Sequence, residues 1–197
     1  FAYGSGVFRQ DDFKSHFRPS KMPMLDFILC VDDAKLWHEK NLKLNPNHYS
    51  KFSSLIGPRR IAQMQDDFGA KIFYNTLVTV PMGPYEGRLM KYGVISKLNL
   101  ILDLSKWKWL YAAGRMHKPV LEIQRPKCKQ LNEAKKTNLK LAVMTSLLFL
   151  PEKFSEKELY LKIAELSYKG DVRMGLAENP HKISNIVNFG LERFRDL

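Results

Sequence analysis

The amino-acid sequence predicts an α/β fold of the α+β type, in which a mixed β-sheet is followed by a small helical unit. Three observations support this class. Apolar residues 1–3 lead into a Gly-Ser-Gly turn, residues 71–80 and 89–95 are rich in β-branched and aromatic side chains, and apolar residues after residue 137 recur at helical spacing. Strands are therefore expected in the first part of the chain and helices in the last part.

The composition is that of a globular protein with an anionic partner. The chain has 197 residues, of which 45% are hydrophobic, enough for one large domain or two small ones. Its formal net charge of +12 favours nucleic acid, an anionic lipid or a nucleotide, without choosing among them. Cys30 and Cys128 indicate no disulfide framework, which favours a reducing compartment. No apolar run approaches the ~18–20 residues of a membrane-spanning helix.

The turn Gly4-Ser5-Gly6 follows the first expected strand, and residues 7–10 are expected to begin a helix. Its glycines expose backbone N–H groups and its serine offers a hydroxyl, both of which suit an anion at a helix N-terminus. A turn this short also joins many strands to helices without binding anything. The turn alone therefore favours an ordinary connection.

The next expected strand, within residues 24–33, is apolar but carries Asp26. Burying an unpaired carboxylate costs several kcal/mol, so Asp26 needs a partner, a metal or an exposed position at the sheet edge. Asp32 shares the strand face of Asp26 by alternation, and Asp33 lies at the strand end. These two acids are the weaker candidates for a metal site.

Residues 35–67 are expected to contain less regular structure. Residues 35–49 show no clean period and predict a loop with a helical turn, and His38 and His48 in it lack further ligands at zinc spacing. Hydrogen-bonded structural roles are therefore expected for both histidines. Residues 49–67 predict a helix that is interrupted at Gly57-Pro58.

Residues 71–80 and 89–95 predict an antiparallel hairpin. Lys91 lies on its second strand. A solvated lysine on an edge strand is one interpretation. If the hairpin packs beside the strand of Asp26, Lys91 instead faces the same site as Asp26.

Residues 96–113 predict one helix, because four apolar residues fall on one face: Leu100, Leu104, Trp107 and Tyr111. Asp103 within it is expected to be solvated or to cap a helix. Gly114-Arg115 is expected to end the helix. Arg115 and Lys118 could bind phosphate, although cations near a helix C-terminus also stabilise the helix itself.

The remaining chain is expected to be helical. A basic, polar linker places the domain boundary within residues 120–137, which gives domains of residues 1–122 and 123–197. Helices are expected at residues 139–148, after a capping box at residues 155–158, and after Asn179-Pro180. With the connection at residues 168–174, these helices resemble a winged-helix unit, a shape that does not assign a function.

A Gly-Ser turn followed by an acid on the next strand resembles the polymerase-beta-like nucleotidyltransferases, whose turn holds the nucleotide triphosphate and whose strand acids hold magnesium. Further motifs follow in the order of one family: Trp37-His38, Asn45-Pro46, His48-Tyr49-Ser50, Gly69-Ala70-Lys71, Lys91-Tyr92-Gly93-Val94, Gly114-Arg115-Met116-His117-Lys118-Pro119 and Gly170-Asp171-Val172-Arg173-Met174. Over nearly its whole length the chain resembles the mitochondrial phosphatidate cytidylyltransferases, also called translocator assembly and maintenance proteins.

The resemblance implies transfer of the cytidylyl group of CTP to phosphatidate, with Mg²⁺ as cofactor, a step toward cardiolipin and phosphatidylglycerol. It implies CTP, phosphatidate and an anionic membrane surface as partners, no nucleic acid, and peripheral attachment at the matrix side of the mitochondrial inner membrane. Because the chain begins with Phe1 instead of Met, we expect a targeting segment before it, and the resemblance implies an amphipathic segment after Leu197. The sequence indicates no oligomeric state.

The resemblance also implies roles for individual residues. Gly4, Ser5 and Gly6 would hold the triphosphate, Asp26 would hold magnesium, and the remaining catalytic or phosphate-binding residues would be Lys91, Arg115 and Lys118. The wider superfamily usually has two acids two residues apart, whereas Met24 and Ile28 stand at that spacing here. A second metal ligand would then come from elsewhere, with Asp32 or Asp33 as the candidates.

Two other functions remain open on the sequence. One is a nucleotidyltransferase that acts on RNA, which the net charge of +12 and a winged-helix-like unit would suit. The other is a non-catalytic protein that binds an anionic partner, with Asp26 paired to a lysine. An assay for pyrophosphate release that depends on the acceptor separates the three.

Overall fold

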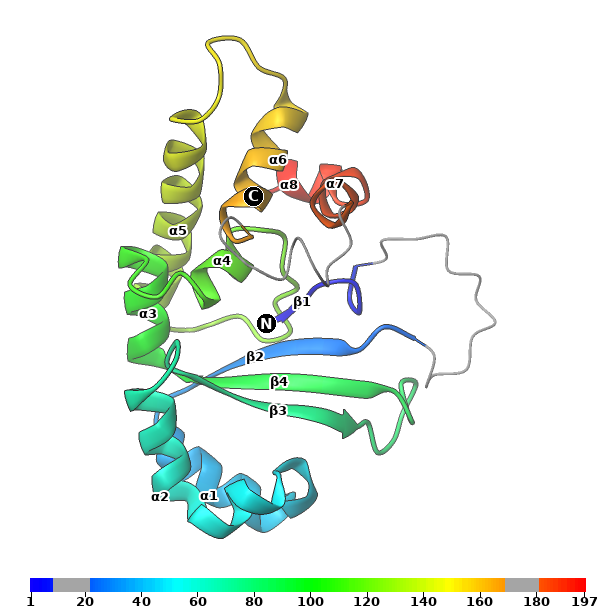
Figure 1. Ribbon diagram of the computed structural model, residues 1–197, viewed down its shortest axis with the longest axis vertical. Helices are drawn as coiled ribbons and strands as arrows, with labels where there is room; N and C mark the ends of the chain where they lie inside the picture. The colour runs from blue at the N-terminus through cyan, green and yellow to red at the C-terminus, as the bar shows by residue number, and fades with distance from the viewer. Residues whose placement is uncertain (9–21, 169–180) are drawn as a thin grey trace.

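The computed structural model describes residues 1–8, 22–168 and 181–197 (Figure 1). The chain folds around a four-stranded sheet of order β1-β2-β4-β3. β1 (Ala2–Tyr3) is antiparallel to β2 (Leu25–Val31), β2 is parallel to β4 (Leu89–Ser96), and β4 is antiparallel to β3 (Ile72–Thr79). The mixed sheet predicted from the sequence is confirmed, and the more specific nucleotidyltransferase fold stays a prediction.

The predicted hairpin is confirmed, and its second strand lies beside the strand that carries Asp26. β3 and β4 pair in antiparallel register, with an irregularity between Asn75 and Val78. β4 lies directly beside β2, and Lys91 is opposite Asp26 in the register of the two strands. Lys91 therefore faces the same site as Asp26, as expected for a hairpin packed beside that strand. Lys91 therefore lies on a central strand of the sheet, and the alternative of an edge-strand lysine is wrong.

Each face of the sheet is covered by helices (Figure 1). On one face, Ile28 and Ile95 belong to a core that includes residues from α3 (Lys97–Lys106), α4 (Ala112–Met116) and the first part of α5 (Lys129–Leu147). On the other face, Tyr92 and Val94 belong to a second core. α1 (Ala34–Leu44) and α2 (Lys51–Asp67) lie on that side. Alternation along β2 places Asp26 on the same face as Ile28.

The loop expected over residues 35–49 is wrong, because most of it is α1. Asp33 explains the helix: its Oδ1 accepts a hydrogen bond from the backbone N–H of Leu36 at 2.9 Å, which is an N-cap. The structural interpretation of His38 is confirmed, since its buried ring contacts Tyr49 Oη at 2.9 Å and Gln65 Oε1 at 3.0 Å. α2 is interrupted as predicted, with Gly57 at φ 77°.

The single helix expected over residues 96–113 is two helices. α3 ends at Lys106 because Trp107 takes the left-handed conformation at φ 50°. Asp103 is fully buried, and its carboxylate accepts hydrogen bonds from the backbone N–H groups of Trp109, Leu110 and Ala113 at 2.7–3.0 Å. It therefore caps the connection and is not solvated. Gly114-Arg115 lies inside α4 and does not end a helix.

α5 begins at Lys129, well before residue 139, and it contributes to two cores. Leu131 and Ala134 pack in the core of the sheet, whereas Ala142 packs in a further core among α6 (Glu156–Leu166), α7 (Lys182–Asn188) and α8 (Leu191–Arg195). The domain boundary within residues 120–137 stays a prediction, because this helix continues from one core into the other.

The helical part confirms the predicted capping box, in which Ser155 and Glu158 bond reciprocally at the start of α6. The helix expected after Asn179-Pro180 is two short helices, separated at Gly190. Residues 169–180, which include most of the connection at residues 168–174, lie outside the described residues. The winged-helix arrangement therefore stays a prediction. No helix in the described residues is long and apolar enough to cross a membrane.

Candidate active site

Three neighbouring strands bring Tyr3, Asp26 and Lys91 into one row. Tyr3 pairs with Asp26 across β1 and β2, and Asp26 pairs with Lys91 across β2 and β4. Residues directly opposite one another on adjacent strands point to the same face of the sheet. The ammonium nitrogen of Lys91 lies 2.9 Å from Oδ1 of Asp26, so the partner that Asp26 requires is Lys91.

The ion pair is largely shielded from water. The side chains of Lys91 and Asp26 are 32% and 21% exposed. Burial opposes the charge on Lys91, but the hydrogen bond and attraction of Asp26 outweigh it and raise the pKa of Lys91. Lys91 is therefore a fixed positive charge at neutral pH.

The Gly-Ser-Gly turn lies against this carboxylate. Gly4 has φ 76°, and a Cβ atom there would lie 3.3 Å from Oδ2 of Asp26. Val7 and Phe8 donate backbone hydrogen bonds to the carbonyl of Gly4 at 3.1 and 3.0 Å, so residues 4–7 form a turn. Of the helix expected over residues 7–10, residues 7 and 8 belong to this turn and the bend after it, and residues 9 and 10 lie outside the described residues.

Gly6 differs from its two neighbours in what surrounds it. A Cβ atom at Gly6 would lie 2.1 Å from the carbonyl oxygen of Met24, so only glycine fits against the backbone before β2. Arg88 fixes the turn against this backbone, because its guanidinium donates hydrogen bonds to the carbonyls of Gly6 at 2.7 Å and Pro23 at 2.6 Å. Gly4 and Ser5 line the pocket described below, whereas Gly6 positions the turn.

Tyrosines surround the cations of the site. Glycine at position 93 allows the ring of Tyr74 to lie across β4, since a Cβ atom there would lie 2.7 Å from that ring. The Tyr74 hydroxyl is 3.2 Å from the Tyr3 hydroxyl, and burial raises the pKa of Tyr74, which keeps it neutral. The Arg115 guanidinium stacks 3.7 Å from the centre of the Tyr111 ring and donates to the Tyr111 carbonyl at 2.9 Å.

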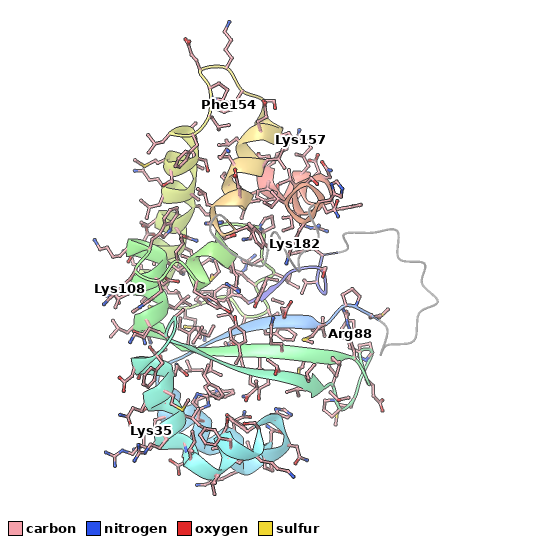
Figure 2. All side chains as sticks on the ribbon, viewed as in Figure 1. Lys35, Arg88, Lys108, Phe154, Lys157 and Lys182 are labelled. Atoms are coloured by element: carbon pink, nitrogen blue, oxygen red, sulfur yellow. The ribbon has the colours of Figure 1, made fainter. Side chains whose placement is uncertain are left out.

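A pocket of about 390 Å³ opens between the sheet and the helical part. We call its two sides the sheet wall and the helical wall. The sheet wall consists of Tyr3, Gly4, Ser5, Asp26 and Lys91. The helical wall consists of Lys118, Ser167, Tyr168, Lys182 and Arg193. Arg115 also lines the pocket, with its guanidinium 5.9 Å from the ring centre of Tyr3 on the sheet wall. Figure 2 shows Lys182 in the middle of the molecule, between β1 and helices α6 and α7.

Lys118 is held on the helical wall by neutral groups. Its ammonium donates hydrogen bonds to the carbonyl of Gly114 and to the hydroxyl of Ser167. Burial, and then the nearby charges of Arg115 and Lys182, lower the pKa of Lys118 to about 7. Gly114 allows this approach, since a Cβ atom there would lie 2.9 Å from Cβ of Ser167.

The structure does not bring Asp32 or Asp33 to Asp26. Asp32 is 85% exposed and pairs with Lys97, and Asp33 caps α1. Six residues of strand at about 3.3 Å each separate Asp32 from Asp26 by roughly 20 Å, so alternation alone could not predict proximity. Within the described residues, no group of three or more His, Cys, Asp or Glu side chains could hold a metal ion.

Several pocket residues were missed on the sequence. Tyr3 and Tyr111 carry no motif beyond their aromatic character, and Ser167, Lys182 and Arg193 reach the pocket only through the packing of the helical part. The one usable signal was the proximity of Tyr3 to the Gly-Ser turn. The others depend on contacts between segments that are far apart in the sequence.

Comparison with known proteins agrees with the resemblance found in the motifs. A family model described as "Phosphatidate cytidylyltransferase, mitochondrial" matches residues 1–197. Proteins of that name from Danio rerio and Homo sapiens are 50% and 47% identical over the whole chain, which covers 56% and 42% of their lengths. One from Schizosaccharomyces pombe is 42% identical over 99% of the chain and 47% of its own length. The chain spans about half the length of the curated relatives it matches. It belongs to the mitochondrial phosphatidate cytidylyltransferase family.

Proposed function

We propose that this chain carries the site at which the cytidylyl group of CTP is transferred to phosphatidate, giving CDP-diacylglycerol and pyrophosphate. The observation that carries the proposal is the row of Tyr3, Asp26 and Lys91 beside a Gly-Ser turn on one wall of a pocket. The relatives described above bear the name of this enzyme. The product is a precursor of cardiolipin and phosphatidylglycerol.

In this reaction the protein mainly has to position the two substrates and neutralise the charge of the triphosphate. An oxygen of the phosphatidate phosphate bonds to the α-phosphorus of CTP, while the bond from that phosphorus to the bridging oxygen breaks and its electrons leave with pyrophosphate. Gly4 and Ser5 would offer N–H groups and a hydroxyl to the triphosphate. Lys91 and Arg115 would neutralise its charge, and Lys118 adds a further cation to the pocket.

Asp26 is the residue that we propose to hold Mg²⁺. Magnesium in nucleotide-dependent enzymes is commonly bound through one or two carboxylates together with substrate phosphates. A single carboxylate that touches the phosphate-binding turn fits that donor set, whereas it would not hold the ion alone. When bound, the ion would neutralise charge on the triphosphate and on the leaving pyrophosphate.

We further propose peripheral attachment to a membrane, at the matrix side of the mitochondrial inner membrane. Phosphatidate is anchored in a bilayer by its acyl chains, so the pocket must work next to the headgroups. The net charge of +12 supports attraction to an anionic leaflet. The names of the relatives support the mitochondrial location.

The deciding experiment is an acceptor assay with purified protein, radiolabelled CTP and Mg²⁺. Phosphatidate, RNA or no acceptor is added, and both pyrophosphate and the labelled product are measured. Pyrophosphate release that requires phosphatidate and yields CDP-diacylglycerol supports the proposal. Extension of RNA would support the RNA alternative instead, and absence of magnesium-dependent CTP binding would support the non-catalytic alternative.

A further inference from the structure

Two lysines of the helical wall lie over the same aromatic ring. The ammonium of Lys118 is 5.0 Å from the centre of the Tyr168 ring, and that of Lys182 is 5.2 Å from it. Each ammonium is attracted to the ring, but the two positive charges also repel one another, since the charge of Lys182 lowers the pKa of Lys118. An anion that bound beside both ammonium groups would relieve this repulsion.

The immediate partners of Lys118 suit an anion site. Its hydrogen bonds go to a carbonyl, that of Gly114, and to the hydroxyl of Ser167. No ion pair joins Lys118 to a carboxylate in the described part of the chain. A charged ammonium that is buried without a counter-ion is costly, which is consistent with its lowered pKa. A ligand that supplied negative charge would therefore stabilise Lys118 in its charged form.

The positive charge of the pocket is divided between its walls. The sheet wall offers the turn at Gly4 and Ser5, together with Lys91 and the adjacent Arg115. These groups already match a triphosphate. Ser167 and Lys182 are presented from the opposite, helical wall, next to α6 and α7 of the other core. Lys118 follows α4, which packs in the sheet core, and reaches the helical wall through its hydrogen bond to Ser167.

We propose that Lys118, Ser167 and Lys182 form the subsite for the phosphate monoester of phosphatidate. This assignment rests on the proposed function, and it moves Lys118 from the triphosphate to the acceptor. A phosphate monoester carries a charge of about −1.5 to −2 at neutral pH, which matches two ammonium groups, and its oxygens can accept the Ser167 hydroxyl. Binding on the opposite wall also lets the acceptor approach the α-phosphorus from a direction other than that of the leaving pyrophosphate.

The test is direct binding, measured separately for the two substrates. Dihexanoyl phosphatidate, CTP with Mg²⁺, and inorganic phosphate are each titrated into the wild type and into Lys182→Met, Lys118→Met and Ser167→Ala by calorimetry. Lys157→Met is the matched control, because this exposed lysine lies near the start of α6, far from Lys182 (Figure 2). Dihexanoylglycerol, which lacks the phosphate, controls for binding of the acyl chains.

Each lysine variant is expected to weaken binding of dihexanoyl phosphatidate at least about tenfold, the effect of losing one charge-assisted hydrogen bond. CTP affinity should change less than about threefold, and Lys157→Met should change neither. Inorganic phosphate should compete with dihexanoyl phosphatidate in the wild type, and far less in Lys182→Met. Repeating the titrations in buffers of different ionisation enthalpy should show more proton uptake on phosphatidate binding in the wild type than in Lys118→Met, since an anion beside Lys118 raises its pKa, whereas proton release from the bound phosphate is common to both.

The possible failures are distinguishable. If the lysine variants weaken CTP and leave phosphatidate unaffected, the subsite belongs to the triphosphate and the inference is overturned, whereas the proposed function stands. If all variants bind phosphatidate as the wild type does, the inference is overturned as well. If phosphatidate binding depends on both lysines and yet no CDP-diacylglycerol forms from CTP, the subsite stands and the proposed function fails. Ser167→Ala, which keeps both charges, supports the inference if it weakens phosphatidate alone.

Discussion

Replacing Asp26 by asparagine is expected to abolish cytidylyl transfer while leaving a folded protein. An amide keeps the size of the carboxylate but removes the negative charge that the proposed magnesium site needs. It also leaves Lys91 half-buried without its counter-ion, 2.9 Å from a neutral group. Both activity and stability should therefore fall, for separate reasons.

The loss of stability can be bounded from the geometry of the ion pair. At 2.9 Å, two unit charges attract by about 1.4 kcal/mol in water and about 6 kcal/mol at an effective dielectric constant of 20. Because the Lys91 and Asp26 side chains are 32% and 21% exposed, screening and desolvation reduce the net value to about 1–3 kcal/mol. For a chain of this size that corresponds to a fall in Tm of roughly 2–12 °C.

The assay pairs turnover with thermal unfolding in Asp26→Asn, Lys91→Met and the double variant. Turnover should fall at least about 100-fold in Asp26→Asn, equivalent to ~2.7 kcal/mol of lost transition-state stabilisation. The double variant, in which both charges are gone, should recover Tm to near the wild-type value and remain inactive. Near-normal turnover by folded Asp26→Asn would refute the role of Asp26. A double variant no more stable than the singles would refute the ion-pair argument.

Three further predictions concern the turn, Lys118 and the membrane. Ser5→Ala should weaken CTP binding by about tenfold, and Gly4→Val should weaken it more, because φ is 76° at Gly4 and a Cβ atom there would contact Asp26. If calorimetry gives both variants the CTP affinity of the wild type, the turn is purely structural. The pKa of Lys118, about 7, lies below its ordinary value of 10.5, so its burial destabilises the fold fully below pH 7 and less as pH rises toward 10.5. Lys118→Met should therefore raise Tm by a few degrees at pH 6 and by less at pH 9, and a difference independent of pH would contradict this. Flotation should show weak binding to vesicles containing phosphatidate or cardiolipin that is lost at high salt, and salt-insensitive binding would show that attachment is not mainly electrostatic.

The sequence could predict the sheet face of the site because its signals are local. Asp26 in an apolar strand and Lys91 in a second strand were recognisable from alternation, and the family resemblance implied that both lie near the Gly-Ser turn. The structure adds that they pair directly in register. What the sequence could not tell was that a carboxylate such as Asp33 would cap a helix instead of joining a metal site. Both roles use the same atoms, and only the neighbouring backbone distinguishes them.

The helical wall was largely beyond prediction for a related reason. α5 begins at Lys129, but the sequence of its first turns predicts a basic linker. The reason is that Leu131 and Ala134, which pack in the sheet core, are isolated apolar residues among polar ones. For Asp103 the sequence left open a solvated or a capping role, because its three backbone donors come from the loop that follows α3 and from the start of α4. Lys182 carries no local pattern at all. Its relevance arises only from the packing of α7 over the pocket.

The continuity of α5 limits how the pocket can open and close. A hinge between two lobes normally lies in a connection that few contacts cross. Here the connection is one helix of 19 residues, about 28 Å long, fixed at one end by Leu131 in the sheet core and farther along by Ala142 in the helical core. Rotating one lobe against the other would require bending this helix or withdrawing one of those side chains, and both cost packing energy. We therefore expect ligands to enter and leave the pocket through movements of shorter elements at its rim, such as α7 and α8, while α5 holds the two cores at a fixed separation.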